Sequence, residues 1–109
     1  MSYSWTYTTW PDPDTAEAAA ERLLEERLCA CANIIRGMNS VYRWQGKVET
    51  ALETVMILKT QGDIAPTLCA RIVELHPYDE PCVLNLPVDP GGSAAGFLAW
   101  IDSETGGKA

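Results

Sequence analysis

The chain has 109 residues, of which 47% are hydrophobic, and these values describe one globular domain that can bury a core of its own. Its 15 Asp and Glu residues against eight Lys and Arg residues give a formal net charge of −7. Because binding along a phosphate backbone needs clustered cations, this charge excludes a nucleic-acid-binding protein and disfavours an anionic membrane surface as a partner.

No apolar run reaches the ~20 residues of a membrane-spanning helix, and the first residues do not resemble a secretory signal. We therefore expect a cytoplasmic location, where cysteines are kept reduced. The four cysteines, Cys29, Cys31, Cys69 and Cys82, are expected to be buried thiols. On a strand, Cys29 and Cys31 would share a face, so a metal ion bound between them stays open as an alternative.

Residues 3–10, with the sequence YSWTYTTW, are aromatic and β-branched and predict a first strand with alternate residues on opposite faces. The following Pro-Asp-Pro-Asp segment ends this strand. Either Asp12, followed by Pro13 at the first helical position, or Asp14 is expected to cap a helix over Thr15–Leu28. The apolar stripe of this helix consists of Ala16, Ala20, Leu23, Leu24 and Leu28.

The small apolar residues 29–35 predict a buried strand, which is interrupted around Gly37 by a turn or a bulge. A long hairpin follows. Its first arm is predicted over Val41–Gln45, its turn at Gly46 and its returning arm over Thr50–Thr60.

Asp63 is expected to cap a second helix that ends near Leu75, because a residue that precedes a proline disfavours the helical region. Pro81–Val88 predicts the last strand. Ala94–Ile101 predicts a short helix with aromatic and aliphatic anchors.

The order of these elements predicts an α+β protein with the ferredoxin-like βαββαβ plan, an antiparallel sheet with an extra C-terminal helix and a long β-hairpin. Residues 1–105 are expected to form this single domain, with a frayed tail over 106–109. Both main helices should cover one face of the sheet, which leaves apolar side chains on the other face. A monomer rarely exposes such a patch, so we expect self-association.

Several side chains are candidates for a functional site. His76, the only histidine, could serve as a metal ligand, a proton shuttle, a polar ligand contact or a structural residue at a helix end. Tyr42, Trp44 and Tyr78 carry polar groups on aromatic rings, which is typical of subunit interfaces and of ligand clefts. The carboxylates of Glu49, Glu53, Asp79 and Glu80 are expected to be solvated. Since no nucleophile–base pair, phosphate loop or dinucleotide motif is present, we predict no enzymatic activity.

Six stretches of the chain are distinctive: PDPDTA at 11–16, ERLCACANII at 26–35, SVYRWQGKVE at 40–49, ETVMILKT at 53–60, ELHPYDEP at 74–81 and NLPV at 85–88. Together they resemble one known family, the CutA divalent-cation tolerance proteins. The resemblance implies a ferredoxin-like fold, a tight homotrimer built partly from the long hairpins, and kinship in shape with PII signal proteins. It also implies a link to copper and other divalent metals.

The resemblance is incomplete at the positions that bind copper in some family members. Those members present a cysteine near the end of the first strand and two adjacent histidines before the Pro-Tyr, whereas this chain has Thr8 and the pair Leu75-His76. His76 is therefore the remaining metal candidate. Copper prefers two or more nitrogen or sulfur ligands, so one imidazole would bind it weakly.

The sequence thus predicts a non-enzymatic, cytoplasmic homotrimer of the CutA type, linked to the response to copper and other divalent metals. The alternative is a PII-like regulatory protein with a small-molecule ligand between subunits, near Tyr42, Trp44, Glu49 and Tyr78. No cofactor is assigned, and Cu(II) or another divalent cation is the candidate. The expected partner is the chain itself, without nucleic acid or membrane.

Overall fold

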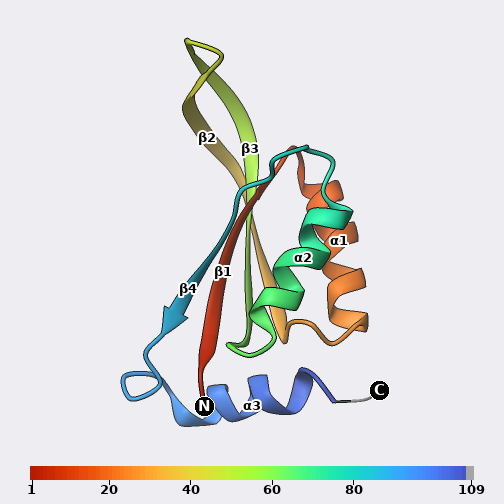
Figure 1. Cartoon of the computed structure of the whole chain (residues 1–109), viewed down its shortest axis with the longest axis vertical. Helices are drawn as coiled ribbons and strands as arrows, with labels where there is room; N and C mark the ends of the chain where they lie inside the picture. Colours follow the sequence, from red (N-terminus) through yellow and green to blue (C-terminus); the bar gives the residue numbers. More distant parts are fainter. Residues whose placement is uncertain (108–109) are drawn as a thin grey trace.

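Four strands and three helices make up the computed structural model of the chain, which describes residues 1–107 (Figure 1). In chain order these elements are β1 (Tyr3–Trp10), α1 (Pro13–Glu25), β2 (Cys31–Trp44), β3 (Lys47–Gln61), α2 (Ala65–Leu75), β4 (Val83–Val88) and α3 (Ala95–Glu104). The strands form one antiparallel sheet in the order β2-β3-β1-β4. The predicted plan is therefore confirmed. None of the helices in this part of the chain is long and apolar enough to cross a membrane.

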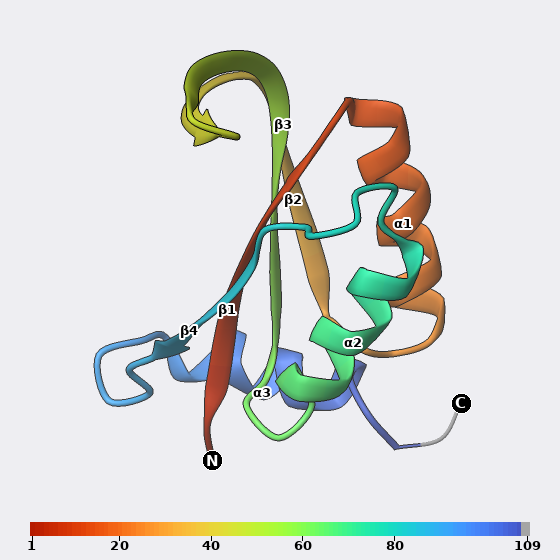
Figure 2. The same cartoon turned by 45° about the horizontal axis from the view of Figure 1, so that its top comes forward.

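Helices α1 and α2 cover the same face of the sheet, as predicted (Figure 2). Strand β1 directs alternate residues toward them, and Thr6, Thr8 and Trp10 are fully buried. The centre of the core between the helices and the sheet is formed by Trp10, Leu23, Met56, Leu58, Leu68 and Ile72. Burying each large apolar side chain contributes roughly 1.5–3 kcal/mol, so this core fixes the ends of β1 and α2 relative to each other.

Helix α1 begins with the first of the two predicted caps, two residues before the predicted start at Thr15, and it ends earlier than predicted. Asp12 is its N-cap and accepts a hydrogen bond from the Thr15 N–H at 2.8 Å, with Pro13 as the first helical residue. The expected end at Leu28 is wrong, because the backbone reverses at Arg27, whose φ is 60°. The Leu28 N–H bonds to the carbonyl of Leu23 at 3.0 Å, which is the six-to-one bond of a Schellman motif.

Arg27 also ties the end of α1 to the end of α3. Its guanidinium donates to the carbonyls of Gly106 at 3.0 Å and Ser103 at 2.8 Å, and its own carbonyl accepts from the Gly106 N–H at 2.9 Å. These bonds stabilise a left-handed conformation that usually requires glycine at this position. Gly106 belongs to the segment predicted to fray, of which residues 108 and 109 lie outside the described residues.

Strand β2 and strand β3 are longer than predicted and form one continuous hairpin. β2 does not break at Gly37. Gly37 has a φ of 73° and lies in a β-bulge, where the register with β3 shifts between Ile35 and Met38. The turn consists of Gln45 and Gly46, both with positive φ, the signature of the two-residue turn that matches strand twist. The far end of this hairpin extends beyond the body of the protein (Figures 1 and 2).

The later elements differ from expectation mainly at their ends. The predicted cap at Asp63 is wrong, since α2 begins after Ile64 without a side-chain cap. The Ile64 N–H instead donates to the backbone carbonyl of Gln61 at 3.0 Å, in a turn. β4 begins at Val83 rather than Pro81, because Val83 is the first residue paired with β1. α3 runs to Glu104 rather than Ile101.

The second face of the sheet is open over most of its area. Helix α3 covers one end of it, where Leu98 and Ile101 pack against Tyr3 and the partly buried Val88. Beyond this end the face carries the exposed side chains of Ile35, Leu84 and Leu86. The prediction of exposed apolar side chains on this face is therefore confirmed.

Candidate functional site

His76 lies directly after α2, and the rest of the chain holds its ring on both sides. Its Nε2 is 2.7 Å from the carbonyl oxygen of Thr9, and its Nδ1 accepts a hydrogen bond from the Tyr78 N–H at 3.1 Å. A carbonyl accepts only, so Nε2 carries the proton and Nδ1 is the acceptor. The ring stacks on Trp10 with centroids 4.1 Å apart and is only 7% exposed.

Burial lowers the pKa of His76, and this effect outweighs the carbonyl of Thr9 and the carboxylate of Glu53, which both raise it. The imidazole is therefore neutral near pH 7. Because both ring nitrogens already have partners, a metal ion could reach either one only by displacing a hydrogen bond. This geometry favours a structural role over the other roles considered for His76.

Thr8 and Leu75, which stand where some members of the resembled family have copper ligands, also direct their side chains into the protein. The Thr8 hydroxyl donates to the carbonyl of Met56 at 2.7 Å and accepts from the Trp10 indole N–H at 2.6 Å. Leu75 packs against the main core. Within residues 1–107, no group of three or more His, Cys, Asp or Glu side chains is arranged to hold a metal ion.

The cysteines are free thiols in the structure. Cys29 is buried in the segment before β2, and burial raises the pKa of its thiol to about 12. Burial also raises the pKa of Cys82. Thiols in this state are weak nucleophiles and weak metal ligands, so packing explains Cys29 and Cys82. The prediction of four buried thiols is wrong for Cys31, Cys69 and Cys82, which are half-buried.

A groove of about 450 Å³ lies where the projecting hairpin meets the loop after α2. Its lining comes from the end of β2 and from that loop, and consists of Tyr42, Trp44, Pro77, Tyr78, Asp79 and Glu80. Three of the four residues predicted for an interface or ligand cleft therefore meet. The fourth, Glu49, pairs with Tyr42 across the hairpin and is not among the lining residues.

The wall of the groove formed by Tyr78 is held by polar contacts. The Tyr78 hydroxyl donates to one carboxylate oxygen of Glu53 at 3.0 Å, and the Ser40 hydroxyl donates to the other at 2.7 Å. Burial and the hydrogen bond to Glu53 raise the pKa of Tyr78 to about 12. The Tyr78 ring also lies 4.8 Å from the ring of His76, centroid to centroid.

Glu53 was predicted to be a solvated carboxylate, whereas it has two hydrogen-bond partners and orients the groove. The signal in the sequence was its place on the returning arm of the hairpin, on the same side as Glu49. The contact with Tyr78 could not be predicted, because the two residues are 25 positions apart and are joined through α2.

Most of the chain matches known proteins closely. Its sequence fits the family model described as CutA1 divalent ion tolerance protein over residues 4–104. The divalent-cation tolerance protein CutA of Pyrococcus horikoshii is 44% identical over 99 residues, which cover 91% of this chain and 94% of that protein. The protein of the same name from Thermus thermophilus is 40% identical over 98 residues, which cover 90% and 93%.

A solved structure gives the same result. The crystal structure of CutA1 from Oryza sativa superposes with a TM-score of 0.93 at 32% identity, covering 99% of this chain and 97% of that one. These matches confirm the resemblance predicted from the sequence motifs, and the chain belongs to the CutA1 divalent ion tolerance family.

Proposed function

We propose that the chain acts as a non-enzymatic homotrimer in the cytoplasmic response to divalent cations. The observation that carries this proposal is the open face of the sheet, which exposes Ile35 on one edge strand, β2, and Leu84 and Leu86 on the other edge strand, β4. Large exposed apolar patches on a folded protein mark association surfaces. The four free thiols fit a reducing compartment.

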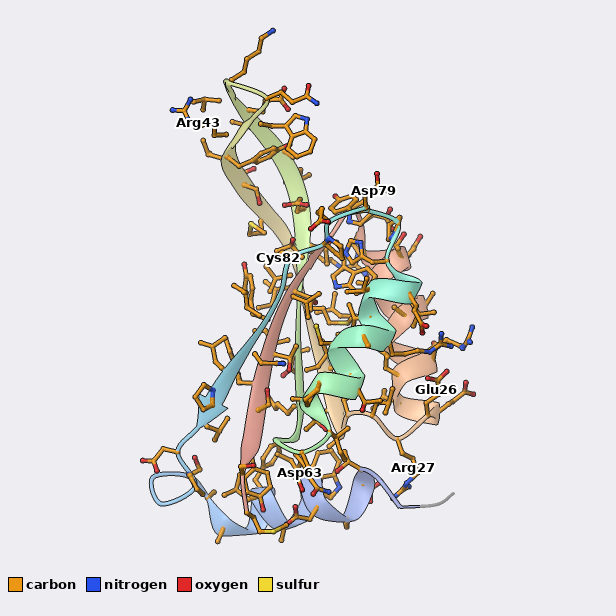
Figure 3. The ribbon with its side chains drawn as sticks, viewed as in Figure 1. Glu26, Arg27, Arg43, Asp63, Asp79 and Cys82 are labelled. Atoms are coloured by element: carbon orange, nitrogen blue, oxygen red, sulfur yellow. The ribbon has the colours of Figure 1, made fainter. Side chains whose placement is uncertain are left out.

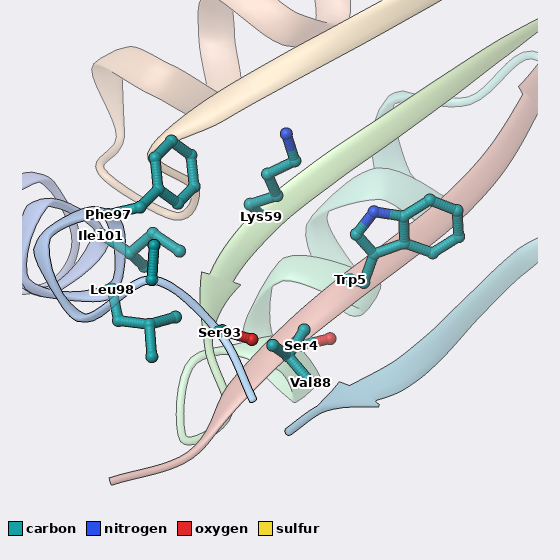
Figure 4. Close-up of a pocket in the computed structure, with 9 residues that line it drawn as sticks. Ser4, Trp5, Lys59, Val88, Ser93, Phe97, Leu98 and Ile101 are labelled. Atoms are coloured by element: carbon teal, nitrogen blue, oxygen red, sulfur yellow. The ribbon is translucent and has the colours of Figure 1, made fainter. Parts of the chain in front are cut away.

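Two further features support self-association. Between α3 and the open face lies an apolar cavity of about 230 Å³, lined among others by Trp5, Val88 and Phe97 (Figure 4). The far end of the hairpin also exposes Val41, Val48 and Leu52 on the side opposite to the groove. Contact with neighbouring copies would remove these apolar surfaces from water.

The association surface can be tested with two matched leucine variants. Leu86 on the open face is 42% exposed and Leu24 on α1 is 39% exposed. We expect Leu86→Glu to reduce the mass in solution from trimer to monomer, and Leu24→Glu to leave it unchanged, because only the first places a charge in the association surface. Light scattering at micromolar concentration measures the mass. A monomeric unmodified protein would overturn the proposal.

For the link to copper, His76 is the ligand candidate that the resemblance leaves. Binding at this residue would require release of the hydrogen bond to Thr9 or to Tyr78. A titration of the reduced protein with Cu(II) and Zn(II), run beside His76→Ala, tests this. Stoichiometric binding that the variant loses would assign the ligand. Equal binding by both proteins would place the divalent cation elsewhere.

The groove beside the hairpin favours a second candidate function, a PII-like regulatory protein that binds a small ligand near the subunit boundary. A concave site with aromatic walls and a few polar groups is the usual form of a ligand site. A panel of metabolites in a thermal-shift assay tests this function. A panel without any stabilising compound would contradict it.

A further inference from the structure

We propose that the groove lined by Tyr42, Trp44, Pro77, Tyr78, Asp79 and Glu80 binds a small organic cation, of the ammonium or guanidinium class. This inference rests on the second candidate function above, since it names the class of ligand for that site. Three features of the groove support it: its aromatic walls, its negative charge without a paired cation, and the lack of a metal-binding group.

The aromatic walls come from two separate elements. Tyr42 and Trp44 are two residues apart on β2 and lie on the same side of the hairpin. Tyr78 comes from the loop after α2, where its hydroxyl bond to Glu53 and its contact with His76 fix the ring. The face of an aromatic ring carries partial negative charge and attracts cations.

The charged side chains at the groove are negative, like the faces of its aromatic rings. Asp79 and Glu80 line it, and Glu53 lies behind Tyr78. In the part of the chain that the structure describes, none of these three carboxylates forms an ion pair. Arg43 lies on the side of the hairpin away from Asp79 (Figure 3), which fits its position between Tyr42 and Trp44 in an alternating strand.

Other cations of the chain do not fill the groove. Lys47 pairs with Trp44 across the hairpin and shares its side, but it is not among the residues that line the groove. The cation that lies over an aromatic ring among residues 1–107 is Lys59, 5.4 Å from the centre of Phe97. The net charge of −7 raises the concentration of cations near the whole surface. The groove is therefore an electronegative site without an occupant from its own chain.

The lining selects among kinds of cation. A divalent metal needs several oxygen, nitrogen or sulfur ligands around one point, and the described residues contain no such group of three. A substituted ammonium or guanidinium ion loses little hydration energy and gains contact with aromatic faces. An anion would be repelled by Asp79 and Glu80.

The experiment compares choline with 3,3-dimethyl-1-butanol, which has the same shape without the charge. Both are titrated into the intact protein by calorimetry, and the indole N–H signals are followed by NMR. We expect choline to bind and to shift the Trp44 signal, and the neutral alcohol to do neither. Mass is recorded in the same samples, so that a failure of assembly is separated from a failure of binding.

Matched variants locate the site. Trp44 is 56% exposed and Trp100 on α3 is 41% exposed, so neither substitution by leucine removes a core residue. Trp44→Leu should weaken choline binding by about two- to fivefold, the range of a single exposed cation–π contact, and Trp100→Leu should leave it unchanged. The double variant Asp79→Asn, Glu80→Gln should also weaken binding, while the double variant Glu21→Gln, Glu25→Gln on α1 should not.

Each outcome decides the proposal. Choline binding that weakens as expected in Trp44→Leu and in the acidic double variant, and not in their controls, supports it. Equal binding of choline and the neutral alcohol, or no binding of choline to an intact trimer, overturns it, while a hit from the metabolite panel would still uphold a small-molecule function. A Trp44→Leu variant that changes the mass but not choline affinity would make the groove a subunit contact and would also overturn it.

Discussion

Replacement of His76 by alanine tests the structural role of its ring most directly. The variant loses the hydrogen bond to the Thr9 carbonyl, the hydrogen bond from the Tyr78 N–H and the stacking on Trp10. Each hydrogen bond contributes about 1 kcal/mol, and the stacked ring contributes about 1 kcal/mol more. We therefore expect the free energy of unfolding to fall by about 3 kcal/mol.

Urea unfolding at pH 7.5 and a fixed protein concentration measures this loss, because concentration affects the stability of an oligomer. Val73→Ala on the preceding helix α2 is the control, since Val73 is exposed and its truncation should cost less than about 0.5 kcal/mol. A His76→Ala variant as stable as Val73→Ala would refute the reasoning, because the ring would then not hold β1 and the loop together.

Three more predictions follow from particular residues. Burial lowers the pKa of His76, so the protein takes up a proton when it unfolds below about pH 6.5. The free energy of unfolding should therefore be at its full value above about pH 6.5 and should fall as the pH drops through the pKa of the folded state. Thermal melts between pH 7.5 and 5 should show this slope, and His76→Gln should lose it. Gly46→Ala should cost about 1 kcal/mol in urea unfolding because φ is 81°, whereas Gln45→Asn should stabilise by a few tenths. Arg27→Ala should lower the free energy of unfolding by about 1–2 kcal/mol and speed amide exchange in α3, because the guanidinium's hydrogen bonds to the carbonyls of Ser103 and Gly106 are lost. Thermal melts without a pH slope would contradict the first of these predictions, unchanged urea unfolding curves the second, and unchanged amide exchange in α3 the third.

The fold could be predicted because its signals are local. The alternation of β1 and the Asp12-Pro13 cap depend on neighbouring residues alone, and both are found as expected. The end of α1 could not be predicted, because Arg27 adopts a conformation that usually needs glycine. It does so through bonds to Ser103 and Gly106, which are distant in sequence.

The same distinction applies to the hairpin and to the groove. Gly37 looks like a break when β2 is considered alone, but the ladder with β3 continues on both sides of it and absorbs it as a bulge. The pairing of Tyr42 and Trp44 on one side follows from strand alternation. The approach of Tyr78 to Glu53 depends on where α2 ends, which no local pattern specifies.

The central position of β1 in the sheet determines the order in which the chain can fold. β1 is made first, but its neighbours are β3 and β4, and Tyr3 pairs with Gln61 on one side and Val88 on the other. The hairpin of β2 and β3 needs only adjacent residues and should form early during synthesis. A nascent chain that has not yet exposed β4 keeps one edge of β1 unpaired, and at that stage the edge is open to strands of other chains.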